Sequence, residues 1–170
     1  MKEYPVQRAA VLKPKPDPDT LVFGKTFTDH MFIMDYTAGQ GWHDGRIVPY
    51  GPLALEPSAM VLHYAQEVFE GLKAYRGPDG GVQLFRPMEN ALRLQSSCER
   101  LCIPPIEPQT VVDAIEELYK EFGTFGERTV SIVLPGKDGV EKMQKIMQTL
   151  RAEGVETEMF YLGNKPIGGC

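Results

Sequence analysis

The 170-residue sequence lacks the features that would direct it to a membrane, an oxidised compartment or nucleic acid. No apolar run approaches the roughly 18 residues of a membrane-spanning helix, and the N-terminus lacks the apolar segment of a secretory signal. The three cysteines, Cys98, Cys102 and Cys170, show no CxxC spacing, which favours reduced thiols. A net charge of -5 argues against general affinity for nucleic acid. We expect a soluble cytoplasmic protein.

Motifs of the common catalytic and metal-binding classes are missing too. The sequence has no GxGxxG before a helix, no GxxxxGK(S/T), no HExxH and no GxSxG. A zinc site would need two ligands in addition to Cys98 and Cys102, and none is suitably spaced, so we predict no metal site. His30, His43 and His63 have aromatic or apolar neighbours in the sequence, and we expect hydrogen-bonded structural roles for them.

The composition that is present, 42% hydrophobic and 24% charged, is typical of a globular domain with its own core. Residues 1–20 alternate proline with charge and are expected to form an extended N-terminal arm. The β-rich runs at 27–36 and 46–50 predict two strands separated by turn residues. A second pair of β-rich runs, on either side of residues 77–81, predicts a hairpin.

Two later segments change from the period of a strand to that of a helix. Residues 89–103 have one apolar face, and residues 108–122 have an apolar face opposite a charged one that includes Glu117, which we expect in solvent. The apolar positions are Leu94, Cys98, Leu101 and Cys102 in the first segment and Val111, Ile115, Leu118 and Phe122 in the second. We predict two helices that contribute these faces to a core.

Residues 123–128, "GTFGER", contain two glycines and no periodicity, and they are the best candidate for a domain boundary. After them, the order strand, helix, strand predicts a compact βαβ unit, which requires a parallel pair and a right-handed crossover. The predicted organisation is an arm at 1–20, an α+β domain at 21–122, a linker at 123–128 and a βαβ appendage at 129–170.

Four strings, "LVFGKTFTDHMFIMDY", "HYAQEVFEGLKAYRG", "LFRPMENALRL" and "RLCIP", resemble the N-terminal small domain of branched-chain amino acid aminotransferases. The resemblance covers about residues 13–122. It implies the small domain of a fold-type IV enzyme, an antiparallel sheet with helices, in a homodimer that uses pyridoxal 5'-phosphate. The implied reaction transfers the amino group of leucine, isoleucine or valine to 2-oxoglutarate.

The resemblance also implies roles for individual residues. Arg93, the arginine of "NALR", would bind the phosphate of the cofactor, for which a bidentate donor is well suited. The rings of Phe23, Tyr64 and Phe69 would line a pocket for a branched aliphatic side chain, with Tyr64 presented to the neighbouring subunit. Lys73 does not match the lysine that bonds to the cofactor, and we predict no catalytic residue in this chain.

The remaining parts of the family's active site belong to a large C-terminal domain. These parts are the cofactor-bound lysine, an acid beside the pyridine nitrogen, and loops around the phosphate. The "YIRP"-type strand that introduces them is not found in the sequence. We therefore expect that the chain alone does not transaminate leucine, and whether it is an enzyme stays open.

Residues 128–170 loosely resemble the start of a class II anticodon-binding domain of the histidyl type. Three alternatives to a transaminase stay open. They are a dimerisation or interaction module without turnover, a tRNA- or RNA-binding module that uses the C-terminal unit, and a fusion of two partial domains at 123–128. Against RNA binding, residues 127–170 contain six basic and six acidic residues, a balance that gives little attraction to phosphates.

Overall fold

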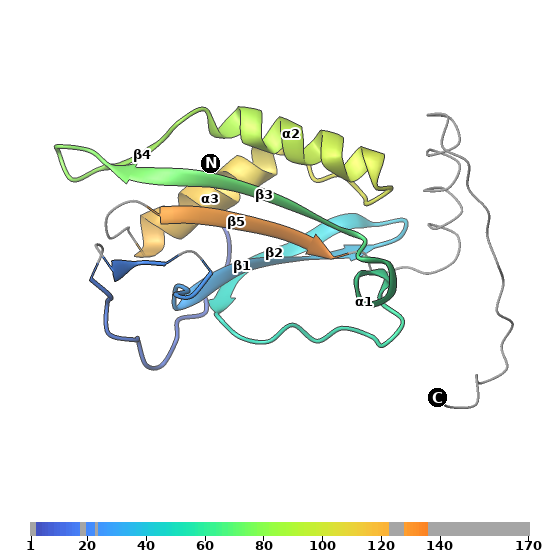
Figure 1. The fold of residues 1–170 in the computed structure, drawn as a ribbon, viewed down its shortest axis with the longest axis horizontal. Coiled ribbons are helices and arrows are strands. Elements are labelled where there is room, and N and C mark those ends of the chain that lie inside the picture. The colour runs from blue at the N-terminus through green and yellow to red at the C-terminus, as the bar shows by residue number, and fades with distance from the viewer. Residues whose placement is uncertain (1–2, 18–19, 23, 123–127, 136–170) are drawn as a thin grey trace, which may run out of the picture.

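The computed structural model describes residues 3–17, 20–22, 24–122 and 128–135 (Figure 1). This part of the chain is a mixture of helices and small antiparallel sheets, in agreement with the predicted α+β class. Its elements, in chain order, are β1 (His30–Thr37), β2 (Gly41–Pro49), α1 (Met60–Tyr64), β3 (Glu67–Arg76), β4 (Val82–Leu84), α2 (Pro87–Arg100), α3 (Pro108–Phe122) and β5 (Arg128–Pro135). Among the described residues, no helix combines the length and apolar character that crossing a bilayer requires.

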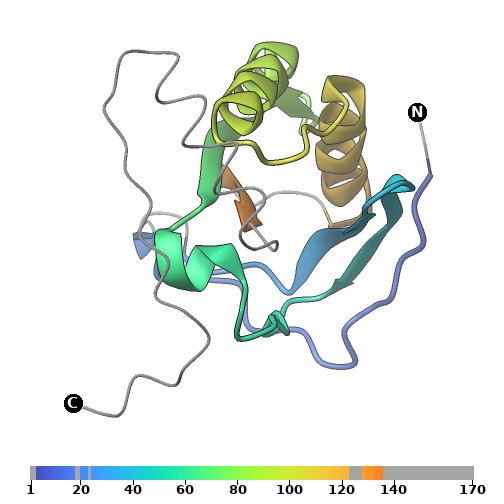
Figure 2. The ribbon, with the colours of Figure 1, turned by 90° about the vertical axis from the view of Figure 1, so that its right-hand side faces the viewer.

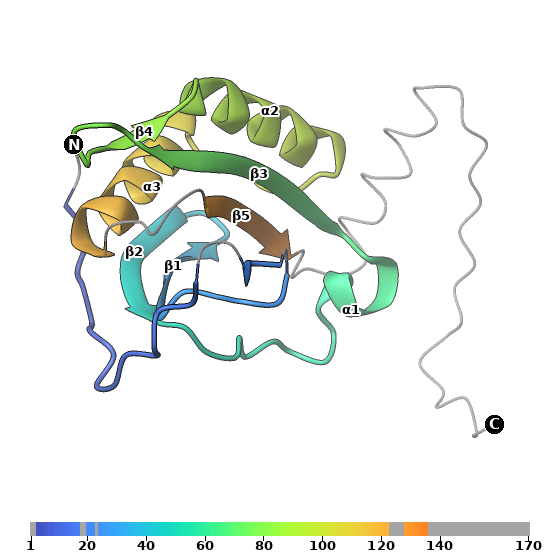
Figure 3. The same ribbon diagram turned by 60° about the vertical axis from the view of Figure 1, so that its left-hand side comes forward.

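Strands β1 and β2 form a two-stranded antiparallel sheet (Figure 3), and the N-terminal arm contacts β2 through one isolated bridge. Val6 forms a parallel bridge with Ile47. The Gln7 amide donates to the Ile47 carbonyl, and the Ile47 amide donates to the Pro5 carbonyl, each at 2.9 Å. Residues 5–7 of the arm are therefore hydrogen-bonded to β2 at Ile47.

The arm is also fixed by side chains on β1 and β2. The buried ring of Tyr4 makes an edge contact with Phe32, with ring centroids 4.9 Å apart. It lies so close to Gly45 that a Cβ there would be 2.8 Å from its Cε1 atom. The ring of His30, also buried, accepts a hydrogen bond at Nε2 from the Ala9 amide at 2.9 Å.

The second sheet has the strand order β4-β3-β5. The β3–β4 hairpin turns at the predicted glycine-rich segment, where the Gly77 amide donates to the Gly81 carbonyl at 2.8 Å and Gly80 has a φ of 81°. Residues 60–69, for which the sequence alone does not decide between a strand and a short helix, form α1 and the start of β3, and Ala65 between them has a φ of 49°.

The position of β5 differs from the predicted division of the chain into domains at residues 123–128. The sequence assigns the strand after residues 123–128 to a separate appendage, but β5 pairs antiparallel with β3 from Glu67 opposite Pro135 to Ala74 opposite Arg128. A β-rich run does not specify its partner, because pairing is decided by surfaces far away in the sequence. The other elements of the predicted βαβ unit lie outside the described residues, so that unit and the remaining domain boundaries stay predictions.

Helix α2 lies over one face of β3, and α3 packs beside α2 (Figure 2); the three elements form the core. Of the predicted apolar positions, Leu94, Cys98, Val111 and Ile115 are buried in this core, and Leu101 packs against it. Cys102 lies beyond the end of α2, and Leu118 is half-buried. Helix α2 ends at Arg100, earlier than expected, and α3 has the predicted bounds. Glu117, expected in solvent, is only 3% exposed and its carboxylate lies 3.5 Å from Lys120 Nζ.

Candidate functional site

The candidate site is built around a buried carboxylate on β3. Successive side chains of a strand point to opposite faces, and the face of β3 that lies under α2 is formed by Val68, Glu70, Leu72 and Ala74, all buried. Three of these four side chains are apolar, and Glu70 is the exception. Its side chain is 7% exposed, and a buried carboxylate is costly unless it is paired and hydrogen-bonded.

Four hydrogen bonds satisfy this carboxylate. Arg93 donates from Nε to Oε2 at 2.8 Å and from Nη2 to Oε1 at 2.6 Å. Oε1 also accepts from Asn90 Nδ2 at 3.0 Å and from the Gly71 amide at 3.1 Å. Asn90 and Arg93 are three residues apart on α2 and share one face. We call Glu70, Asn90 and Arg93 the Glu70 cluster.

The contacts keep both members of the ion pair charged. Burial by itself raises the pKa of Glu70, but the hydrogen bonds from Arg93 and Asn90 and the charge of Arg93 outweigh it, and the net effect lowers the pKa. The hydrogen bond and the charge of Glu70 raise the pKa of Arg93. Both shifts favour the charged form, so the cluster is a carboxylate–guanidinium pair.

The pair uses only one edge of the guanidinium group. An arginine has five N–H donors, and Glu70 accepts from two of them. The side chain of Arg93 is 62% exposed, and within the described residues no acceptor is recorded for Nη1. The donors that Glu70 does not use have the geometry of a fork that matches two oxygens of a phosphate or carboxylate.

The structure does not bring all of the predicted site residues together. Phe69 follows the alternation of β3 to the face opposite Glu70, and its side chain, like that of Tyr64 at the end of α1, is exposed. Phe23 lies outside the described residues. Lys73 lies on β3, as expected from the hairpin. Of the predicted site residues, Arg93 is therefore in an ion pair with Glu70, and Phe69 lies on the opposite face of β3.

Sequence reasoning missed Glu70 and Asn90. Two signals were available. A single glutamate interrupts the buried apolar row of β3, and Asn90 precedes Arg93 by the spacing that places two side chains on one helix face. Together they indicate a buried polar contact between the strand and the helix.

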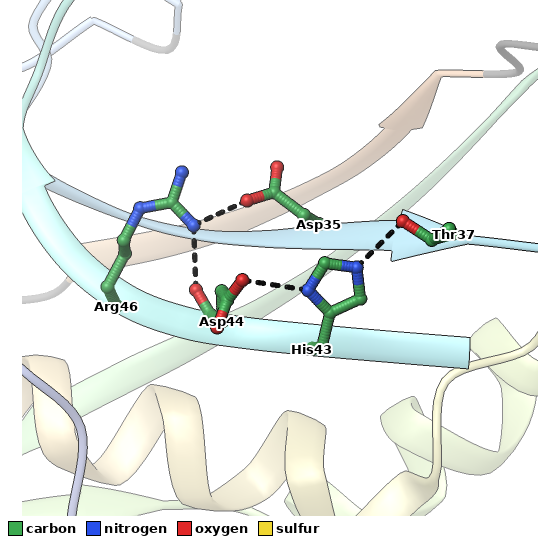
Figure 4. A network of polar contacts seen from close by, with 5 residues as sticks. All are labelled: Asp35, Thr37, His43, Asp44 and Arg46. Carbon is green, nitrogen blue, oxygen red and sulfur yellow. Dashed lines mark hydrogen bonds and ion pairs between the residues drawn. The ribbon is translucent and has the colours of Figure 1, made fainter. Parts of the chain in front are cut away.

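A second polar cluster lies on the β1–β2 hairpin (Figure 4). Thr37 Oγ1 lies 2.9 Å from His43 Nε2, and His43 Nδ1 lies 2.9 Å from Asp44 Oδ2. Arg46 Nη1 donates to Asp35 Oδ2 and to the Asp44 carbonyl, each at 2.7 Å. The order hydroxyl, imidazole, carboxylate is that of a nucleophile with its base.

The hairpin cluster is better explained by structure than by catalysis. The side chain of Asp44 is 74% exposed, whereas the carboxylate that orients a catalytic histidine is buried. Asp44 also has a φ of 51°, and β1 contains a register shift between Ile33 and Asp35. The cluster joins the two strands across this irregularity. His63 Nε2 likewise lies 2.7 Å from the Pro57 carbonyl, so all three histidines make the hydrogen bonds expected of structural residues.

About two thirds of the chain is similar to known proteins. No protein-family model matches the chain. Among curated proteins, the chain is 55% identical over 113 residues to branched-chain-amino-acid aminotransferase 2 of Bacillus subtilis, which is 66% of this chain and 31% of that protein. It is 54% identical over 114 residues to branched-chain-amino-acid transaminase 1 of the same organism, 67% of this chain and 32% of that protein.

A third relative extends the likeness beyond one organism. The chain is 56% identical over 99 residues to a probable branched-chain-amino-acid aminotransferase of Streptomyces coelicolor, 58% of this chain and 27% of that protein. The N-terminal part of the chain is therefore homologous to branched-chain aminotransferases, as its motifs indicated. The chain spans about a third of the length of these relatives. The likeness of residues 128–170 to an anticodon-binding domain has no support among them.

Proposed function

We propose that this chain carries the fold-type IV small domain of a branched-chain aminotransferase, in which Arg93 anchors the phosphate of pyridoxal 5'-phosphate. When bound, that cofactor supplies the electron sink that makes exchange of an amino group for a keto group possible. The described residues fit its phosphate end: Arg93 is charged, exposed and held along one edge. They are assigned no part in the bond-making step.

The remaining predicted roles complete this proposal. Tyr64 and Phe69, exposed in this chain, contribute to the wall of an apolar pocket together with Phe23, which lies outside the described residues. The pocket admits the side chain of leucine, isoleucine or valine, and 2-oxoglutarate accepts the amino group. The identity of at least 54% to the two Bacillus subtilis aminotransferases over two thirds of this chain supports the proposal. RNA binding has no comparable support and stays a sequence-based alternative.

The observation that carries the proposal is the exposed guanidinium of Arg93, which Glu70 holds through Nε and Nη2, and binding of the cofactor tests it. Equilibrium dialysis of the full chain compares pyridoxal 5'-phosphate with pyridoxal, which lacks the phosphate. We expect the phosphate to strengthen binding and Arg93→Gln to abolish that advantage. Arg86→Gln is the matched control, because Arg86 is also on the surface at α2 and pairs with Glu89 at 3.2 Å. Equal affinity for the two probes in the unmodified chain contradicts the proposal.

We also propose that the chain forms a homodimer, because exposed apolar side chains gather at α1. Leu62 and Tyr64 are 60% and 63% exposed there, and large exposed apolar groups mark interaction surfaces. Sedimentation velocity at micromolar concentration tests this, with Tyr64→Ser compared with Tyr75→Ser on β3. We expect Tyr64→Ser to weaken the dimer more. A chain that sediments as a monomer at every concentration contradicts the proposal.

A further inference from the structure

We propose that Glu70 is a positioning residue for the anion site: its buried carboxylate holds Arg93 by Nε and Nη2 so that the Nη1 edge faces the bound phosphate. The inference rests on the proposed role of Arg93 as the phosphate anchor. It assigns to Glu70 no contact with the anion. Its effect passes entirely through the orientation of the guanidinium.

The geometry allows this because the carboxylate is itself immobile. Glu70 belongs to β3 and pairs there with Ile132 of β5, and its Oε1 atom accepts hydrogen bonds from Asn90 Nδ2 and the Gly71 amide. Asn90 also donates to the Gly71 carbonyl at 3.2 Å, which fixes the amide plane. The bond between Arg93 and Glu70 therefore transfers the rigidity of the sheet to an otherwise exposed, flexible side chain.

The alternative to positioning is a purely electrostatic effect, and it has the opposite sign. A carboxylate beside an anion site repels the anion, so removal of its charge would strengthen binding if charge were all that mattered. If Glu70 holds Arg93 in place, its removal frees the guanidinium, and anion binding must then order a long side chain. The direction of the change in affinity separates the two explanations.

The principal experiment measures the affinity of the full chain for inorganic phosphate and for pyridoxal 5'-phosphate. We expect Glu70→Gln to weaken both by about tenfold, comparable with the loss of an outer partner of a ligating side chain at a metal site. Glu99→Gln removes an equal charge from an exposed position on α2, the helix that carries Arg93. It is expected to leave both affinities unchanged. Tighter binding of phosphate by Glu70→Gln overturns the inference.

Two further variants keep the test independent of folding defects. Asn90→Ala leaves every charge in place and loosens only the support of Glu70, so it is expected to weaken phosphate binding in the same direction and by less. In an Arg93→Gln background, Glu70→Gln is expected to have no additional effect, because its action requires the arginine. Additive losses in the double variant overturn the inference.

A spectroscopic readout reports on orientation directly. In the unmodified chain, the Nε–H proton of Arg93 donates to Glu70 and is expected to give an NMR signal protected from solvent exchange. Glu70→Gln is expected to remove that protection. If Arg93→Gln leaves phosphate affinity unchanged, the proposed function fails together with the inference. If Arg93→Gln weakens binding and Glu70→Gln does not, the inference alone fails.

Discussion

The close contact between Gly45 and the N-terminal arm leads to a sharp prediction for Gly45→Ala. The added Cβ would lie 2.8 Å from Cε1 and 3.1 Å from Cδ1 of Tyr4, and 3.0 Å from Cζ of Phe32. Real Cβ atoms do not come that close to ring carbons, and both rings are held against each other. One of two things must follow: either the rings are forced apart, or the arm leaves the edge of β2.

The two outcomes bound the expected loss of stability. Overpacking of a packed position costs about 1–3 kcal/mol. Release of the arm forfeits its two hydrogen bonds with Ile47, about 1 kcal/mol each, and the burial of the Tyr4 ring, about 1.5–3 kcal/mol. The regained freedom of the arm offsets part of that loss. We expect Gly45→Ala to lower the free energy of unfolding by about 2 kcal/mol.

Urea unfolding and amide hydrogen exchange together decide this prediction. The control is Gly51→Ala, because a Cβ at Gly51 meets no atom within 4 Å, and we expect it to change the unfolding free energy little. In Gly45→Ala, a released arm would expose the amides of Gln7 and Ile47 to exchange. A variant as stable as the unmodified chain, with both amides still protected, would refute the reasoning from this contact.

Three other predictions follow from buried groups. Burial, with a smaller contribution from Arg8, lowers the pKa of His30 against the opposing charge of Asp29, so the folded state excludes a proton that the unfolded state binds below pH of about 6.5. The contribution of His30 to stability is complete above that pH and is lost as the pH falls, by at most about 1.4 kcal/mol per pH unit. His30→Gln should therefore reduce the difference between the urea midpoints measured at pH 7.5 and at pH 5.5. An unchanged difference would contradict the prediction. Leu94→Ala, at a position 1% exposed, should cost about 3–5 kcal/mol, whereas Leu92→Ala, at a position 45% exposed on the same helix, should cost far less; equal urea midpoints would contradict the assigned core. Burial raises the pKa of the Cys98 thiol to about 11, so iodoacetamide should label Cys98 only on unfolding. Peptide mass mapping measures the labelling, and rapid labelling of Cys98 in the native chain would contradict its burial.

The sequence predicts well those elements whose signal is local. The helix at 108–122, the stripe through Leu94 and Cys98 and the turn at 77–81 are all present in the structure, because periodicity and glycine chemistry act over a few residues. Contacts between distant segments were not predictable in this way. The partner of β5, the pairing of the arm with Ile47 and the burial of Glu117 all depend on neighbours that a local pattern does not specify.

The candidate site shows the same division. Arg93 was identified by resemblance to a family, and the structure places it in a charged, oriented pair. The partner that orients it, Glu70, comes from a strand far from α2 in the sequence, so neither helical periodicity nor strand alternation alone joins the two. The pair would be predicted by a rule that assigns each charged residue in a buried strand, such as Glu70, a cationic partner on the helix that covers the strand.

The late position of β5 in the chain has a consequence for synthesis on the ribosome. Until Arg128–Pro135 has left the exit tunnel, the edge of β3 that it will occupy has unpaired amides and carbonyls, although β4, α2 and α3 are already available to fold. An unpaired strand edge is a template for association with other nascent chains. Translation speed over the codons of β5, and chaperones that shield this edge, would therefore affect the yield of folded protein.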